Sequence, residues 1–211
     1  MSNWFVNNFI EIFGAVTGII YVIFEIRQNS WLWPLGLATA AAYVLIFFRS
    51  KLYADMSLQT YYVVISALGW YWWMRAGGQG DVLENEIHPE SLKSDIKGLK
   101  VTRVKPKLTI ILIVSFFILW LLLYNVLSRL TDSPVPGWDA FITSLSVIGT
   151  WMLARKIYEH WYLWIVVNLV SVILYFTRGL YLTVILYFVY LTMSFIGLKA
   201  WKKSLETESS S

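Results

Sequence analysis

The sequence predicts an all-α integral membrane protein in which seven transmembrane helices form two parallel three-helix repeats joined by the fourth helix. Three observations lead to this fold class: the composition, the length of the apolar segments and a repeated residue pattern. Hydrophobic residues make up 58% of the 211 positions and charged residues only 14%, whereas about a quarter of a soluble domain is charged. A chain of this composition is expected to place much of its surface in lipid.

Seven apolar segments approach the length of about 20 residues that spans the hydrocarbon core of a bilayer. Several are only 16–18 residues long, so six spanning helices are the alternative count. The N-terminus lacks the basic region of a cleaved signal peptide, and the first segment is therefore expected to be a retained helix. The segments are Phe9–Ile26, Trp31–Phe48, Leu58–Met74, Leu108–Leu127, Trp138–Leu153, Trp161–Phe176 and Tyr181–Leu198.

The basic residues are unevenly divided between the two ends of these helices. Of the 17 lysines and arginines, all but Arg49, Lys51, Arg129 and Arg178 fall on the side that carries the C-terminus. By the positive-inside rule this side is cytoplasmic, which places the N-terminus outside and the C-terminus inside. The basic residues are therefore interpreted as topology signals, and no nucleic-acid partner is expected.

The polar stretches divide the chain into five parts. Residues 1–74 are expected to form the first repeat and residues 75–107 a cytoplasmic loop, with a short helix near Pro89–Lys97. Residues 108–127 form the linker helix and residues 138–201 the second repeat. Residues 202–211 are polar and are expected to be a disordered tail.

The repeat is read from matching residues at a constant spacing. Leu52 and Leu180 are 128 positions apart, and so are the Ser66-x-x-Gly69 and Ser194-x-x-Gly197 patterns. Because the first and fifth helices cross the membrane in the same direction, the two repeats are expected to be parallel. Parallel repeats are found in transporters whose substrate binds near the midplane between the two copies.

Two predicted helices carry a stripe of polar and aromatic residues on one face. Such stripes are expected to face inward, because unpaired polar groups are costly in hydrocarbon. They fit either helix–helix packing or a ligand cavity, in which aromatic faces bind cations and amides bind hydroxyls or ring nitrogens. The first stripe comprises Gln59, Tyr62, Ser66, Trp70 (or Gly69) and Trp73, and the second comprises Trp161, Trp164, Asn168, Ser171 and Tyr175.

Enzymatic chemistry is not expected from this sequence. It contains no phosphate-binding loop of the G-x-x-x-x-G-K-[ST] type, and neither His88 nor His160 belongs to a metal-binding pattern. No metal or other cofactor is therefore predicted. Glu11, Glu25 and Asp139 lie near helix ends, where solvation is easy, so passive transport is favoured and proton-coupled uptake through Glu25 is an alternative.

Several motifs together resemble the PnuC family of bacterial vitamin transporters, over about residues 10–201. They are Leu52-Tyr53-Ala54 with Leu58-Gln59, Gly69-Trp70-Tyr71-x-Trp73, Trp138-Asp139, Arg155-Lys156, and Trp161-x-x-Trp164-x-x-x-Asn168-x-x-Ser171. The resemblance implies a 3+1+3 arrangement like that of the SWEET sugar transporters, in a bacterial inner membrane. It also implies facilitated diffusion of a vitamin that a cytosolic kinase then traps by phosphorylation, and it admits a homotrimer.

The resemblance places Gln59, Trp70, Trp73, Trp164 and Asn168 in the central site. Trp164 and Trp70 are expected to stack on the substrate, while Thr39 and Tyr43 shape a selectivity wall. Thr39 stands where nicotinamide riboside transporters often have Asn. The sequence around Tyr53-Ala54-Asp55-Met56 is similar to that of thiamine transporters. Thiamine is therefore the first expected substrate, and nicotinamide riboside, with riboflavin after it, is the alternative. A membrane scaffold without transport is the alternative from a different functional class.

Overall fold

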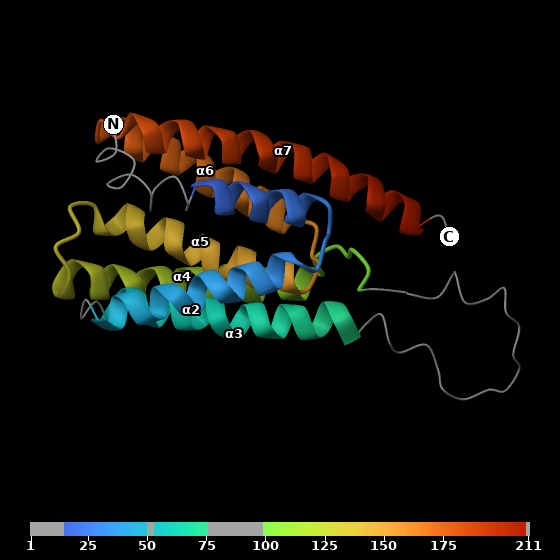
Figure 1. Cartoon of the computed structure of the whole chain (residues 1–211), viewed down its shortest axis with the longest axis horizontal. Coiled ribbons are helices and arrows are strands. Elements are labelled where there is room, and N and C mark those ends of the chain that lie inside the picture. The colour runs from blue at the N-terminus through green and yellow to red at the C-terminus, as the bar shows by residue number, and fades with distance from the viewer. Residues whose placement is uncertain (1–14, 50–52, 76–98, 210–211) are drawn as a thin grey trace, which may run out of the picture.

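The computed structural model describes residues 15–49, 53–75 and 99–209, and this part of the chain is helical, with one isolated β-bridge. Seven helical elements follow one another along it and lie roughly side by side (Figure 1). They are the first helix Ala15–Ile26, α2 (Leu32–Arg49), α3 (Tyr53–Arg75), α4 (Pro106–Leu130), α5 (Pro136–Ala154), α6 (His160–Thr177) and α7 (Tyr181–Ser209). Pro106 and Pro136 begin α4 and α5, where the missing N–H has no helical partner to lose.

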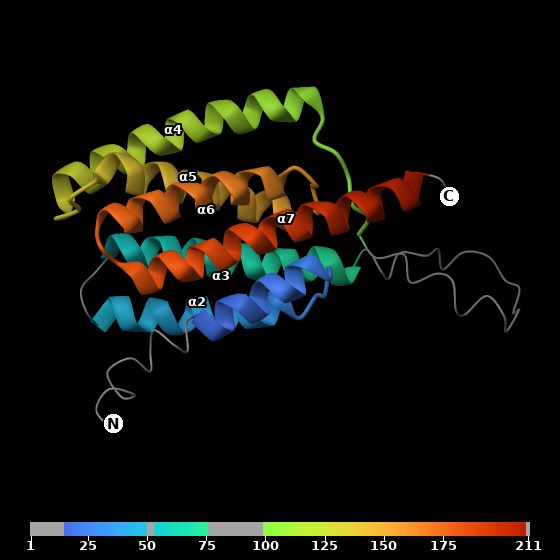
Figure 2. The ribbon, with the colours of Figure 1, turned by 90° about the horizontal axis from the view of Figure 1, so that it is seen from above.

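Helix α4 lies at the outer edge of the bundle, where it packs on α5 (Figure 2). No residue of α4 is buried, although its middle consists almost entirely of large apolar side chains. Ile118 is 62% exposed and Leu121 57% exposed, which would be costly in water. This position suits a helix that connects two halves of the chain along the lipid-facing side.

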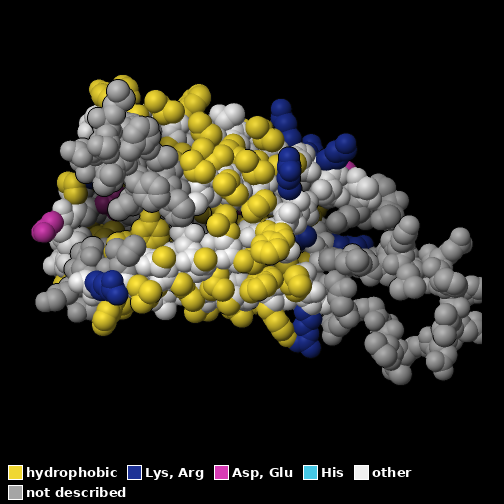
Figure 3. All heavy atoms as spheres, viewed as in Figure 1, with side chains coloured by type: hydrophobic (Ala, Val, Ile, Leu, Met, Phe, Trp, Pro, Cys, Tyr) yellow, Lys and Arg dark blue, Asp and Glu magenta, His cyan; other side chains and the backbone are white. Residues whose placement is uncertain are grey.

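The outer surface of the bundle is that of a membrane protein. Four helices (α2, α4, α6 and α7) are long and apolar enough to cross a bilayer. Figure 3 shows apolar side chains over the middle of the molecule and most lysines and arginines at the end where α7 finishes. Arg75, Arg155 and Lys202 belong to that end, whereas Arg49 and Arg178 belong to the opposite one.

Two tryptophan–glycine contacts organise the interior, and they are 128 positions apart. A Cβ atom added at Gly69 would lie 2.6 Å from the ring of Trp33, and one added at Gly197 would lie 2.2 Å from the ring of Trp161. Both tryptophans have 0% exposure. Each ring therefore lies directly on the backbone of a neighbouring helix, at a place where only glycine leaves room.

The connections before α2 and before α6 also correspond at this spacing. Gln28 and Lys156 have φ angles of 52° and 49° and are the positive-φ residues other than glycine in the described chain. The Lys156 ammonium donates to Gln28 Oε1 at 3.4 Å, so the two turns touch each other. These paired contacts favour two parallel repeats, and the 3+1+3 division into repeats and linker stays a prediction.

The segment before α4 is tied to the connection between α5 and α6. The Thr102 N–H donates to the carbonyl of Lys156 at 3.0 Å, and the Tyr158 N–H donates to the carbonyl of Thr102 at 2.9 Å. Val101 is buried against the same connection. The last residues of the predicted polar loop are therefore packed against the bundle.

The C-terminal prediction needs correction, because α7 continues to Ser209 where residues 202–211 were expected to be a disordered tail. Trp201 is buried and donates to the carbonyl of Glu25 at 3.0 Å, which holds this end of α7 on the bundle. Gln28 donates to Ser204 at 3.0 Å, one turn further on. Tertiary contacts can keep a polar segment helical, and here the contacts of Trp201 and Ser204 hold the end of α7 on the bundle. The composition of residues 202–211 alone does not reveal these contacts.

Some predictions fall outside the described residues. They are the start of the first segment at Phe9, the short helix near Pro89–Lys97, and the environment of Leu52. The other predicted segment ends agree with the helices to within about one turn, apart from the beginning of α3 and the end of α7.

The tryptophan–glycine contacts can be tested by Gly69→Ala and Gly197→Ala. Each added methyl group would overlap a buried ring, and overpacking of this kind costs about 1–3 kcal/mol. We expect both variants to melt several degrees below the wild type in detergent. Gly137→Ala in α5 is the control, because its new Cβ would lie 4.0 Å from the nearest side chain. Equal melting temperatures for all three variants would contradict the packing described here.

Candidate functional site

Two cavities lie on either side of the first helix, and Gly18, Tyr21 and Trp164 line both of them. The cavity between the first helix and α2 and α3, here called the α2–α3 cavity, has a volume of about 330 Å³. The one between the first helix and α5, α6 and α7, here called the α6–α7 cavity, has a volume of about 260 Å³. Together they have room for a small water-soluble ligand.

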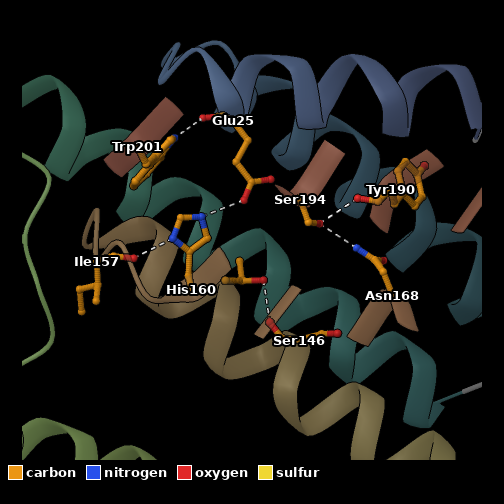
Figure 4. A network of polar contacts seen from close by, with 9 residues as sticks. Glu25, Ser146, Ile157, His160, Asn168, Tyr190, Ser194 and Trp201 are labelled. Atoms are coloured by element: carbon orange, nitrogen blue, oxygen red, sulfur yellow. Dashed lines mark hydrogen bonds and ion pairs between the residues drawn. The ribbon is translucent and has the colours of Figure 1, made fainter. Parts of the chain in front are cut away.

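The α6–α7 cavity has a polar wall built from two neighbouring helices. The Asn168 amide donates from Nδ2 to Ser194 Oγ at 3.0 Å, and Ser194 donates to the carbonyl of Tyr190 at 2.8 Å (Figure 4). Both Asn168 and Ser194 are buried. Because Asn168 is held in a fixed orientation, its amide can serve as a directed hydrogen-bonding group for a ligand.

Trp164 lies at the junction of the two cavities. Its Nε1 is buried and has no hydrogen-bond partner among the described residues. Most buried N–H groups in proteins are paired, so an unpaired one beside a cavity calls for an explanation. An indole in this position offers a ligand both an aromatic face and one donor.

The α2–α3 cavity is lined by residues that correspond to the wall of the α6–α7 cavity. Gln59, Tyr62 and Ser66 of α3 line the first, and Tyr187, Tyr190 and Ser194 of α7, each 128 positions later, line the second. Thr39 of α2 also lines the α2–α3 cavity, but its hydroxyl donates to the carbonyl of Leu35 on its own helix at 2.9 Å. The α2–α3 cavity thus resembles its counterpart in position, and amide and hydroxyl side chains belong to the lining of both.

Most of the predicted site residues line these cavities. Those of the α2–α3 cavity are Thr39, Tyr43, Gln59, Tyr62 and Ser66; Trp164 lines both cavities, and Asn168 lines the α6–α7 cavity. The structure therefore brings both predicted stripes toward the centre of the bundle. Whether they bind a substrate stays a prediction.

Three predicted site residues line neither cavity. Trp70 is 40% exposed on the outer face of α3, because Gly69 takes the inward position and Trp33 fills the space above it. Trp73 is buried and donates to the carbonyl of Ala154 at 3.2 Å, which makes it a packing residue between α3 and α5. Ser171 is buried, yet it lies apart from both cavities. The expected stacking of Trp70 on the substrate thus has no support from its position.

Sequence reasoning missed a buried acid–base pair at one end of the α6–α7 cavity. Glu25 Oε1 lies 3.2 Å from His160 Nε2, and their side chains are 3% and 0% exposed. His160 Nδ1 lies 2.7 Å from the carbonyl oxygen of Ile157 (Figure 4). In the sequence both residues stand at helix ends, where they look solvated. One signal in the sequence was that Trp161 follows His160 directly, and its ring centroid lies 4.7 Å from that of the imidazole.

The comparisons with known proteins decide the family. A family model described as "Nicotinamide mononucleotide transporter" matches residues 8–203, which is most of the chain. The chain belongs to this family. It is thus a member of a family of membrane transporters, and its apolar helices make it a multi-pass membrane protein.

The similar proteins include transporters of two vitamins. "Nicotinamide riboside transporter PnuC" of Escherichia coli (strain K12) is 25% identical, over 96% of this chain and 89% of that one. "Riboflavin/roseoflavin transporter RibM" of Streptomyces davaonensis is 23% identical, over 90% and 83%. PnuC of Neisseria mucosa is 26% identical, over 92% and 72%.

A solved structure supports the fold. The "Crystal structure of the Vitamin B3 transporter PnuC" matches with a TM-score of 0.68 and 22% identity, over 98% of this chain and 87% of that one. Thiamine, the first substrate expected from the sequence, finds no support among these relatives, which are named for nicotinamide riboside and riboflavin. Tyr53-Ala54-Asp55-Met56, whose similarity to thiamine transporters favoured that substrate, opens α3.

The different roles of two neighbouring tryptophans can be tested by Trp161→Phe and Trp164→Phe. Both indole N–H groups are unpaired among the described residues, so the two substitutions differ in packing rather than in lost hydrogen bonds. Trp161→Phe empties space against Gly197 and Trp201, and a cavity of this kind costs about 1–3 kcal/mol.

Trp164→Phe is expected to lower the melting temperature by less, because Trp164 borders both cavities, whereas Trp161 borders one and also packs on Gly197 and Trp201. Thermal unfolding of both variants in the same detergent measures the difference. A larger loss of stability for Trp164→Phe would show that Trp164 is a packing residue and not part of a cavity wall.

Proposed function

We propose that this protein carries nicotinamide riboside across a bacterial inner membrane by facilitated diffusion. The observation that carries the proposal is the α6–α7 cavity, in which the face of Trp164, the amide of Asn168 and the buried carboxylate of Glu25 border one space. A flat, positively charged ring with a carboxamide and ribose hydroxyls matches these three groups. The names of the relatives from Escherichia coli and Neisseria mucosa support the same substrate.

In this proposal each cavity group has a separate role. The pyridinium ring stacks on Trp164, where an aromatic face attracts a cation most strongly away from water. Asn168, oriented by Ser194, hydrogen-bonds the carboxamide or a ribose hydroxyl. Gln59 and Ser66 offer the equivalent contacts on the other side of the first helix, along the path between the two cavities.

The direction of uptake follows from topology and chemistry together. The excess of lysine and arginine at the C-terminal end of α7 supports a cytoplasmic C-terminus and an external N-terminus. The sequence has no nucleotide-hydrolysing loop, and in this proposal the substrate gradient is the driving force. A cytosolic kinase that phosphorylates the nucleoside maintains this gradient, because it removes the free nucleoside from the cytosol. The homotrimer implied by the family resemblance stays a prediction.

The scaffold alternative predicts a different interior. In a scaffold the two polar stripes would be fully packed against neighbouring helices. Instead, the stripes border cavities and Trp164 keeps an unpaired N–H, which favours a ligand-binding role.

Uptake into proteoliposomes tests the proposal. We expect nicotinamide riboside to reach the same concentration inside and outside the proteoliposomes with no ion gradient present. A higher concentration of nicotinamide riboside inside than outside would contradict facilitated diffusion. Thiamine and riboflavin, supplied in the same assay, should enter more slowly. If thiamine or riboflavin enters faster than nicotinamide riboside, that vitamin is the substrate.

Asn168→Ala tests the site itself, and we expect it to slow uptake at least about tenfold, the loss that follows when a buried polar partner of a substrate is removed. The matched control is Asn125→Ala on α4, where an exposed asparagine donates only to the carbonyl of Leu121 on its own helix. Uptake by that variant should equal the wild type. Normal uptake by a folded Asn168→Ala protein would reject the α6–α7 cavity as the site.

A further inference from the structure

The Glu25–His160 pair has a proton arrangement that its contacts define. A carbonyl oxygen only accepts hydrogen bonds, so His160 Nδ1, at 2.7 Å from the Ile157 carbonyl, carries a hydrogen. The contact between Nε2 and Oε1, at 3.2 Å, then holds one further proton, on the imidazole or on the carboxyl group. In either form the pair has no net charge, which is the state that a buried site with 0% and 3% exposure favours.

Glu25 nevertheless faces the cavity as well as His160. It lines the α6–α7 cavity together with Trp164, Asn168 and Ser194. In Figure 4 one carboxylate oxygen points to the imidazole, and the other points to the side on which Ser194 and Asn168 lie. Its backbone is fixed, because Trp201 donates to the Glu25 carbonyl at 3.0 Å. The carboxylate can therefore meet a ligand in the cavity without a movement of the helix.

Other charged or titratable groups near the pair have distinct places. Tyr21 of the same helix and Tyr187 and Tyr190 of α7 line the cavity with Glu25. The Lys156 ammonium, from the connection before α6, lies 4.3 Å from the ring centroid of Trp73 and donates to Gln28. From α5 the cavity wall receives Ile142 and Ser146, which carry no charge. Among the described lining residues, Glu25 is thus the one that carries a carboxyl group.

We propose that Glu25 selects positively charged substrates, and that the proton it shares with His160 leaves when the cation binds. Before binding, the pair is neutral. After binding, the carboxylate is an anion, His160 is a neutral imidazole, and the substrate supplies the compensating positive charge. One proton passes to the solution for each cation bound, so the charge of the occupied site stays at zero. This inference rests on the proposed function and narrows it to cationic nitrogen heterocycles.

The mechanism explains why an acid–base pair is better than a lone carboxylate at this place. An unpaired carboxylate inside the bundle would be costly and would attract inorganic cations into the empty cavity. His160 neutralises it until an organic cation arrives whose ring can also stack on Trp164. Selection thus needs both the charge and the flat ring.

Proton release on binding is measured on the wild-type protein by calorimetry. Nicotinamide riboside is titrated into purified full-length protein in buffers of different ionisation enthalpy, first at about pH 6 and then at about pH 8. We expect close to one proton released per cation at the lower pH, and affinity that rises up to about tenfold per pH unit. The uncharged 1,4-dihydro form of the same nucleoside should release none.

Glu25→Gln tests the same claim by charge selectivity. We expect the ratio of affinities for the cation and for the uncharged dihydro form to fall at least tenfold, with proton release lost. Binding of the uncharged form reports that the variant is folded. An unchanged ratio, or wild-type binding of the cation without proton release at either pH, would overturn the role of Glu25 and leave the proposed function intact. If the wild type binds neither form, the proposed function itself fails.

Discussion

Every polar group inside a membrane-embedded bundle needs a partner within the protein, and the arrangement of this chain depends on that constraint. The interior meets it with short contacts that cross between helices: Asn168 with Ser194, Trp73 with the Ala154 carbonyl, Trp201 with the Glu25 carbonyl, and Glu25 with His160. The exceptions among the described side chains are the unpaired N–H groups of three tryptophans and the hydroxyl of Ser171. One of those groups, Trp164 Nε1, lies where two cavities meet. The unpaired Trp164 N–H is therefore one of the observations that support the proposed site.

The same constraint explains the place of the glycines. Hydrogen-bonded contacts between helices require close packing, and glycine at positions 69 and 197 leaves room for the buried rings of Trp33 and Trp161. Each ring also meets a second tryptophan edge-on, with centroid distances of 5.5 Å for Trp33 and Trp73 and 5.9 Å for Trp161 and Trp201. These two clusters anchor the walls of the two cavities at one end. They leave the opposite parts of α3 and α7 free to line the central space.

Much of the fold and part of the site could be predicted from the sequence. Segment length and hydropathy give the helices, because lipid imposes one length on them, and helical periodicity gives the inward stripes that contain Gln59, Ser66, Trp164 and Asn168. Periodicity could not decide between Gly69 and Trp70, which are neighbours on the helix and differ by about 100°. That choice depends on Trp33, which comes from another helix. The Glu25–His160 pair was hidden for a similar reason, since its partners are 135 positions apart.

The helical tail after Trp201 and the substrate were the least predictable features. The tail depends on contacts with Gln28 and Glu25 that no local pattern reveals. The substrate depends on which groups border the cavities, and Thr39, which first favoured thiamine, lines the α2–α3 cavity with its hydroxyl bound to a carbonyl of its own helix. An aromatic stripe attracts any flat cation, so it cannot separate two vitamins that share this character.

A crystal structure of the protein with nicotinamide riboside bound would show directly where the substrate lies. We expect the pyridinium ring on the face of Trp164, the polar substituents within hydrogen-bonding distance of Asn168, and the Glu25 carboxylate beside the positive charge. A nucleoside bound elsewhere, for example in the apolar groove between α4 and α6, would contradict this expectation.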